Sequence, residues 1–346
     1  MKDIIYQALS VVFFVLHIQD ADCFIPLIPL GFTGAGMAGI YAGYSYLKCK
    51  VAECCIDKYI PADTSRLDDM LKEELFGQKI AHDTVLHAIS GHLSRLHPVK
   101  PLAMSFHGLP GSGKNFVVQM IAKALFKKGE DSEYYHFFNG RDRFPHERLV
   151  ETYKVELQNT IIDSIQKCDR SLFVFDEVDK MPEGVLNALV PILDYTTYFR
   201  LSGVNKNKSI FIFLSNTGSQ QIVKRLLELW ENGRKREETG LQDFESLITI
   251  GAFNEKGGFH RSDAIETSLI DHYVPFLPLE ESHVISCIKR YFRERLINDP
   301  SAQMIEEVLS HVTFDPPPHN LYSKAGCKRV EQKVAIIANR KHSNLR

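Results

Sequence analysis

Two glycines and a lysine in the stretch GLPGSGKN have the spacing of a phosphate-binding P-loop, G-x-x-x-x-G-K-[S/T]. In such a loop, backbone N–H groups hold phosphate oxygens and the lysine reaches the β- and γ-phosphates. The first seven places match, but the eighth holds an asparagine where a hydroxyl normally binds Mg²⁺. Because an amide oxygen is also a hard ligand, we predict an altered but working metal site. The predicted cofactor-binding residues are Gly108, Leu109, Pro110, Gly111, Ser112, Gly113, Lys114 and Asn115, the last also as a metal ligand.

Two further stretches supply polar groups directly after apolar runs. SLFVFDEVDK (171–180) suits a buried strand that ends in two acids, and SIFIFLSN (209–216) suits another that ends in an amide. Ligands of open α/β sheets bind at the carboxyl ends of the strands. We expect Asp176 to hold Mg²⁺, directly or through water, and Glu177 to polarise the attacking water. The amide of Asn216 is expected to orient the same water.

The residues around the P-loop predict the elements that position it. Leu102–His107 is a short apolar run typical of a buried strand, and Asn115–Lys128 has apolar residues at helical spacing. A strand before and a helix after are the context that a P-loop requires. Alone, each stretch is also compatible with a glycine-rich turn or with solvated acids. Together they favour a nucleoside triphosphate site with Mg²⁺ in an α/β fold, a parallel central sheet with helices on both faces.

Composition excludes one broad class of function. The 346 residues carry 41 basic and 43 acidic side chains, a formal net charge of −2. A dedicated nucleic-acid binder is expected to have a strongly basic domain, so we expect no nucleic-acid partner. The basic runs GRKRE (233–237) and NRKHSNLR (339–346) are interpreted as a solvated helix face and a tail.

The N-terminal stretch predicts entry into the secretory pathway. Residues 1–22 contain one lysine followed by the apolar run IIYQALSVVFFVLHI, which has the length of a signal peptide; a buried helix is the alternative. Residues 23–48 include 24 consecutive uncharged residues with small residues at four-residue steps. We predict a membrane-associating segment that lies in one leaflet, with a true span as the second reading. The chain has seven cysteines, and an even six remain if Cys23 leaves with the signal; this number and a glycosylation sequon at Asn207 fit an oxidising compartment.

With these motifs in place, the chain from about Leu71 to Val334 resembles the AAA+ ATPases of the Clp-like branch. The set GSGKN, FPH, VPFLPLE and GCK, after a signal and an apolar segment, resembles the torsin family more closely. The resemblance implies a P-loop AAA+ fold with a large α/β subdomain at 71–278 and a small helical subdomain at 279–340. A linker at 49–70 precedes them and a tail at 341–346 follows. It also implies an ATPase of the endoplasmic reticulum and nuclear envelope lumen that uses ATP and Mg²⁺.

Two departures from other Clp-like ATPases bear on turnover. Leu269 stands where those relatives have an arginine finger, a residue worth several orders of magnitude in phosphoryl transfer. The torsin resemblance implies that the lumenal domain of a membrane-anchored, AAA-like activator donates the missing arginine; Arg261 is a less favoured substitute. Sensor 2, usually G-A-R, is G-C-K here, so Lys328 is expected to approach the phosphates as a point charge.

The resemblance also suggests cysteine pairs. It implies a disulfide between Cys287 and Cys327, beside the nucleotide, and two interpretations stay open: that its redox state tunes the nucleotide response, or that it is purely structural. Among the remaining cysteines, we expect Cys49 to pair with Cys168.

The expected function is an activator-dependent ATPase that remodels protein or membrane assemblies. The aromatic-glycine pore motif of threading unfoldases is missing, so we do not expect a threading mechanism. We expect a homo-oligomer with peripheral membrane association. The alternative is a nucleotide-dependent interaction module whose ATP state recruits a partner. A cytosolic Clp-like unfoldase is a third interpretation.

Overall fold

The computed structural model describes residues 49, 52–195, 205–263 and 268–344. The chain divides into two compact units, Met1–Ala52 and Glu53–Arg346, and all elements described below belong to the second. The predicted signal peptide (1–22) and apolar segment (23–48) lie outside the described residues. Among the described helices, none has both the length and the apolar character needed to cross a membrane.

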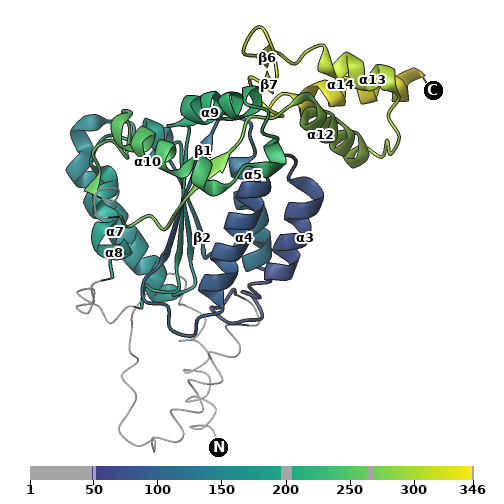
Figure 1. Ribbon diagram of the computed structural model, residues 1–346. Helices are drawn as coiled ribbons and strands as arrows, with labels where there is room; N and C mark the ends of the chain where they lie inside the picture. The colour runs from purple at the N-terminus through teal and green to yellow at the C-terminus, as the bar shows by residue number, and fades with distance from the viewer. Residues whose placement is uncertain (1–48, 50–51, 196–204, 264–267, 345–346) are drawn as a thin grey trace, which may run out of the picture. The chain divides into compact units, whose positions relative to one another are not determined.

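The centre of the second unit is a five-stranded parallel sheet in the order β2-β3-β4-β1-β5 (Figure 1). Its strands are β1 (Leu102–Gly108), β2 (Tyr135–Asn139), β3 (Leu172–Asp176), β4 (Ile210–Ser215) and β5 (His272–Phe276). β1, β3 and β4, the three strands that were expected to carry the site, are neighbours. Because all strands are parallel, the residues that follow them meet at one edge, called here the carboxyl edge; the opposite edge is the amino edge.

Helices cover both faces of this sheet, as the sequence predicts. One face packs against α3 (Thr64–Glu74), α4 (Lys79–Leu93) and α5 (Lys114–Leu125). The other packs against α7 (Val150–Lys167), α8 (Val190–Leu193), α9 (Ser219–Glu231) and α10 (Glu245–Asn254). Alternate strand residues serve the two cores: Leu172 and Val174 face the first, and Phe173 and Phe175 face the second.

The second core contains a ladder of stacked aromatic rings across three strands. The ring centroids of Phe173 and Phe211 are 4.8 Å apart, and those of Phe175 and Phe213 are 5.1 Å apart. Phe138 of β2 extends the ladder, 5.0 Å from Phe175. Such rings bury large apolar areas and fix the register of neighbouring strands. The ladder therefore helps to hold the ends of β2, β3 and β4 at the carboxyl edge.

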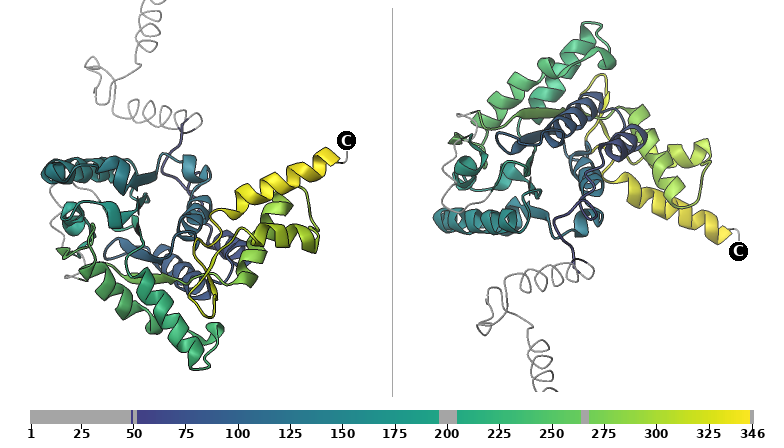
Figure 2. Two further views of the ribbon diagram at one scale, coloured as in Figure 1. Left: turned by 90° about the horizontal axis from the view of Figure 1, so that it is seen from above. Right: turned by 90° about the horizontal axis from the view of Figure 1, so that it is seen from below.

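A small helical subdomain follows the sheet. It contains α12 (Glu281–Glu294), α13 (Ala302–Leu309) and α14 (Val330–Asn344), with a short antiparallel pair of β6 (Phe314–Asp315) and β7 (Tyr322–Ser323). These helices share their own buried core. Figures 1 and 2 show them gathered to one side of the sheet, next to the helices of its first face. Helix α14 continues to Asn344, past the expected boundary at residue 340.

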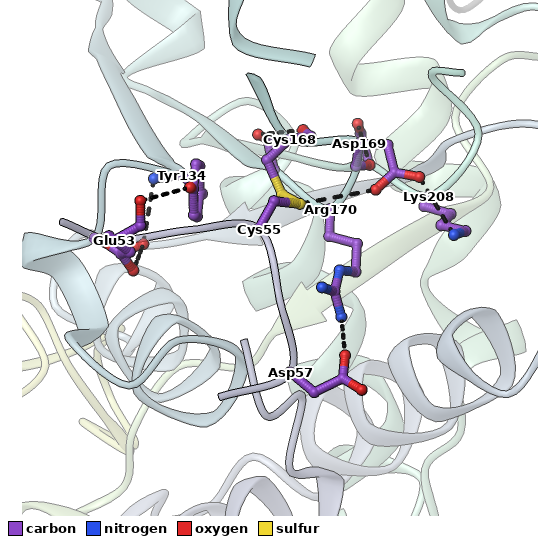
Figure 3. The surroundings of a disulfide bond; sticks show 11 residues. Glu53, Cys55, Asp57, Tyr134, Cys168, Asp169, Arg170 and Lys208 are labelled. Carbon is purple, nitrogen blue, oxygen red and sulfur yellow. Dashed lines mark hydrogen bonds and ion pairs between the residues drawn. A yellow bond between two sulfur atoms is a disulfide. The ribbon is translucent and has the colours of Figure 1, made fainter. Parts of the chain in front are cut away.

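The expected linker at 49–70 is largely part of the folded unit. Figure 3 shows Cys55 joined to Cys168 at the amino edge, with Asp57 facing Arg170. Glu53 is buried, and its carboxylate accepts hydrogen bonds from the Ser132 hydroxyl (2.8 Å) and the backbone N–H of Glu133 (3.0 Å).

The predicted pairing of Cys49 with Cys168 is therefore wrong. Cys168 lies at the C-terminal end of α7, and residues 53–60 cross that end closely enough for Cys55 to bond to it. Which of three neighbouring cysteines reaches Cys168 depends on this crossing, and sequence spacing does not determine it.

Candidate functional site: a nucleotide pocket

A cavity of about 720 Å³ opens at the carboxyl edge, a volume within the range of small-molecule sites. Its wall combines P-loop residues, the ends of β3 and β4, and residues of the small subdomain. The lining side chains that carry the argument are Lys114, Asn115, Asp176, Glu177, Asn216 and Lys328. The structure thus brings together all the polar residues that the three sequence motifs single out.

The P-loop connects the end of β1 to the start of α5. Gly113 has φ of 109° and Gly111 has φ of 78°, backbone conformations that favour glycine. A Cβ at Gly111 would collide with the carbonyl oxygen of Ala325 from the small subdomain. The hydroxyl of Ser112 is buried and has no hydrogen-bond partner among the described residues. An unpaired donor in a glycine loop at a helix N-terminus fits a phosphate oxygen.

Lys114 is held inside the loop. Its Nζ donates to the carbonyl oxygens of Gly108 (2.6 Å) and Leu109 (3.1 Å) and to Oδ1 of Asn216 (3.1 Å). Burial lowers the pKa of Lys114 to about 8, against the opposing effect of the carboxylates of Asp179 and Asp176. A desolvated ammonium without a full counter-charge attracts an anion strongly. The site therefore favours a polyphosphate.

Asp176 and Asn115 contact each other in the cavity lining. The amide Nδ2 of Asn115 donates to Oδ2 of Asp176 at 3.0 Å, so the two side chains already share one place. Carboxylate and amide oxygens are the ligands that Mg²⁺ accepts in proteins, and the ion keeps several waters. These two residues fit a Mg²⁺ ion if the amide turns its oxygen toward it.

Glu177 lies in an unusual backbone conformation and carries an ion pair. Its φ is 52°, which is uncommon for a non-glycine residue and often marks a functional site. Its Oε2 lies 2.8 Å from Nε of Arg141. Arg141 belongs to the short helix α6 (Gly140–Arg143), which follows β2; the pairing of Asn139 with Asp176 places this helix beside Glu177.

Asn216 follows β4 and is fixed from two sides. Lys114 donates to its Oδ1, and its own Nδ2 and backbone N–H donate to Oδ1 of Asp179 at 3.3 and 3.1 Å. Asp179 is therefore a positioning residue for this amide. The hydrogen bond from the backbone N–H of Asn216 and the Lys180 ammonium favour the carboxylate against burial, and the pKa of Asp179 is lowered.

The small subdomain closes the cavity through the G-C-K stretch. The backbone N–H of Cys327 donates to the carbonyl oxygen of Gly111 at 3.2 Å, and Lys328 lines the cavity. Cys287 of α12 and Cys327 form the disulfide that the family resemblance suggests, and both residues line the cavity. This disulfide therefore lies next to the P-loop itself.

The rest of the wall is apolar and aromatic. It includes Leu75 and Phe76, which lie between α3 and α4, and Phe116, which lies in the first turn of α5. The guanidinium of Arg290 lies 4.2 Å from the ring centroid of Phe116 and pairs with Glu74 at 3.3 Å. Such a wall, away from the phosphate-binding side chains, suits a nucleobase.

Comparisons with known proteins agree with this geometry. The torsin family model matches residues 49–175. A torsin-like protein of Drosophila melanogaster is 40% identical over 327 residues, which is 93% of this chain and 94% of that protein. A torsin-like protein of Caenorhabditis elegans is 41% identical over 309 residues, 88% of this chain and 86% of that protein.

This chain belongs to the torsin family. Solved structures extend the comparison to the fold: yeast Hsp104 in complex with ADP has a TM-score of 0.57 at 18% identity, and Hsp104 with ATPγS and casein has 0.51 at 16%. Each match covers 82% of this chain, which spans about half the length of the Hsp104 chain. Family and fold support a torsin-type AAA+ ATPase that binds nucleotide.

The torsin chain has no arginine at the expected finger position. Leu269 is 3% exposed in the core, and its carbonyl oxygen accepts a hydrogen bond from Lys100 at 2.9 Å. Arg261 is exposed on the surface loop before it. The sequon residue Asn207 is partly exposed in the turn that precedes β4, at the amino edge.

Several residues of the torsin site are absent from the sequence prediction. Asp179 follows the two predicted acids in DEVDK, and this spacing could have indicated a third acidic residue of the site. Arg141 and Arg290 carry no local signal, because their partners lie on other elements. Arg236 of the run GRKRE was expected on a solvated helix face, but its side chain is only 10% exposed and reaches backbone carbonyls.

Proposed function

We propose that this torsin chain is an ATPase of the endoplasmic reticulum and nuclear envelope lumen, which remodels protein or membrane assemblies and depends on an activator. One observation carries the proposal: the cavity has the side chains for binding and water activation, while the finger position holds the buried Leu269. A chain so equipped binds ATP but lacks one charge that phosphoryl transfer needs.

The side chains divide the chemistry among themselves. Lys114 neutralises the β- and γ-phosphates, the Ser112 hydroxyl and the N-terminus of α5 bind phosphate oxygens, and Lys328 adds a second positive charge. A Mg²⁺ ion held by Asp176 and Asn115 would offset the negative charge of the phosphates. Once its ion pair with Arg141 is broken, Glu177 accepts the proton of the attacking water. Asn216, which Asp179 holds in place, orients that water.

The missing charge is assigned to a partner. A neighbouring copy of the same chain in a homo-oligomer has Leu269 at the finger position and cannot supply this charge. An arginine from the lumenal AAA-like domain of a membrane-anchored activator supplies it, with a gain in turnover of about 10³ to 10⁵.

The proposed location rests on the chain's processing signals and cysteines. A signal peptide at 1–22 delivers the chain to the lumen, and residues 23–48 hold it peripherally to a membrane. Disulfides persist in that compartment. Glycosylation of Asn207 follows from the same location, and sensitivity of the cellular protein to endoglycosidase tests it.

An ATPase assay of the lumenal fragment with and without candidate activator domains tests the activity. We expect little turnover alone and a large increase with an activator, which Glu177→Gln abolishes. Fast turnover without a partner would contradict activator dependence.

The ion pair between Arg141 and Glu177 favours one second candidate, an interaction module that binds ATP and recruits a partner with little hydrolysis. ATP-dependent partner binding without turnover in any combination would favour that module.

A further inference from the structure

The side chain of Arg236 is only 10% exposed, although it lies in a part of the chain whose sequence is strongly polar. Its Nε and Nη2 donate to the carbonyl oxygen of Gly77 at 3.1 and 2.6 Å, and its Nη1 donates to the carbonyl oxygen of Pro278 at 2.8 Å. Nη1 also pairs with Oε1 of Glu280 at 3.2 Å. One guanidinium therefore joins three segments, of which two are separated from it by 159 and 42 residues.

Both of the segments that Arg236 joins continue into the nucleotide cavity. Gly77 directly follows Glu74, Leu75 and Phe76 of the cavity wall. Pro278 and Glu280 flank Leu279, which also lines the cavity and begins the small subdomain. Arg236 itself is not part of that wall, so it acts from behind it.

The junction has little freedom to adapt. Gly77 has φ of 67°, and a Cβ there would lie 2.7 Å from the ring of His283. The next residue, Gln78, is 2% exposed; its Nε2 donates to the carbonyl oxygen of Leu277 at 2.8 Å, and its Oε1 accepts from the N–H of Leu277 at 2.9 Å. Gln78 also donates to the carbonyl oxygen of Ser112 at 3.0 Å, which ties the junction to the P-loop.

We propose that Arg236 is a positioning residue that sets the base-binding wall of the nucleotide cavity by fastening Gly77 to Pro278 and Glu280. The inference rests on the proposed nucleotide function and goes beyond it by separating two halves of the site. The phosphate half is held by contacts within the P-loop, with Asn216 and with Gln78, and none of these contacts involves Arg236. The base half, around Leu75, Phe76 and Leu279, depends on the junction that Arg236 holds.

The separation predicts a selective loss of affinity. In Arg236→Ala, the carbonyl oxygens of Gly77 and Pro278 and the carboxylate of Glu280 lose a charged donor. The wall residues next to them lose their fixed position. We expect the Kd for ATP to rise about tenfold or more. The Kd for inorganic triphosphate, which touches only the phosphate half, is expected to stay within about twofold of the wild-type value.

Two further variants sharpen the assay. Arg236→Lys keeps the charge but cannot donate to two carbonyl groups in a planar fork, so an intermediate Kd for ATP is expected. Arg234→Ala is the matched control, because Arg234 lies in the same run but its guanidinium bonds, among the described residues, stay within its own loop: Asp243 at 2.7 Å and the carbonyl oxygen of Glu238 at 2.8 Å. It is expected to bind ATP as the wild type does.

The measurement is competition of ATP and of inorganic triphosphate against a fluorescent ATP analogue, with circular dichroism to show that each variant is folded. If Arg236→Ala does not fold, Arg236→Lys carries the same comparison. Wild-type affinity for ATP in a folded Arg236 variant overturns the inference, and so does an equal loss for ATP and triphosphate. A wild-type chain that binds neither ligand removes the proposed function, and the inference with it.

Discussion

The two edges of the central sheet each carry a disulfide, but they are built for different tasks. At the amino edge, Cys55–Cys168 is accompanied by contacts between distant segments, such as Asp57 with Arg170 at 2.6 Å and Asp169 with Lys208 at 3.3 Å (Figure 3). At the carboxyl edge, Cys287–Cys327 borders an open cavity.

The polar groups at the carboxyl edge are satisfied mainly by one another. Lys114 donates to Asn216, Asn115 to Asp176, and Arg141 pairs with Glu177. Each of these contacts occupies a group that a nucleotide, a metal ion or a water needs. The amino edge therefore fixes distant segments to one another, whereas the carboxyl edge holds a set of exchangeable contacts. Equal chemical changes at the two edges are expected to have unequal effects on nucleotide binding and turnover.

The largest effect is expected at Glu177. Glu177→Gln removes the proton acceptor but keeps the shape, so activated turnover is expected to fall by about 10² to 10⁴. ATP affinity should stay close to the wild-type value, because the binding contacts are elsewhere. Steady-state ATPase rates with an activator and the Kd from titration measure the two quantities. A variant that loses binding as well as turnover would show that Glu177 holds the nucleotide.

Removing each disulfide in turn tests whether the two edges differ in their effect on nucleotide binding. Replacing both cysteines of the Cys55–Cys168 pair by serine opens a loop of 113 residues and should lower the free energy of unfolding by about 5 kcal/mol at most. The Kd for ATP is expected to stay unchanged in the folded protein.

The same double replacement of Cys287 and Cys327 opens a loop of 40 residues, with a cost of about 4 kcal/mol at most, but it also frees a wall of the cavity. Here a change in the Kd for ATP is expected. Chemical denaturation measures the free energy of unfolding of each double variant, and nucleotide titration measures its Kd for ATP. Equal Kd values in all three proteins would make both disulfides structural.

The sequence predicts those parts of the site in which one short segment contains both the element and its chemistry. Three short stretches each indicate a strand and the polar residues that follow it: the glycine loop, the apolar run before Asp176 and the run before Asn216. Parallel strands bring such ends together. The pair Cys287–Cys327 is available only through the family resemblance.

Other features depend on segments that meet only in the fold. Arg236 looks like a solvated cation until Gly77 and Pro278 are packed against it, and Cys55 competes with two neighbouring cysteines for Cys168. Arg141 has no signal at all, because its contact with Glu177 follows from the pairing of β2 with β3. Long-range packing, which local patterns do not encode, decides these cases.

A pH dependence is expected from the carboxyl edge and not from the amino edge. Burial lowers the pKa of Lys114 to about 8 in the free protein, and phosphate binding requires the charged form. As pH rises above about 8, the free lysine loses its proton, so the apparent Kd for ATP should rise by up to about tenfold per pH unit. Lys114→Arg stays charged and should flatten this limb. Titration of ATP from pH 7 to 9.5 measures it, and a flat wild-type profile would contradict the role of Lys114 burial.

The smallest effect is expected at Arg141, and it tests whether the contacts of the carboxyl edge are exchangeable. The side chain of Arg141 is 63% exposed, so its ion pair with Glu177 is screened by water. Removing it in Arg141→Ala frees Glu177 to accept a proton, and turnover should rise about two- to fivefold, the range expected of an exposed ion pair. Arg143→Ala, in the same helix α6, is the matched control and should leave turnover unchanged. A fall in the rate of Arg141→Ala would instead mean that this guanidinium serves the phosphates, and the ion pair would then be a resting place for a charge that takes part in the reaction.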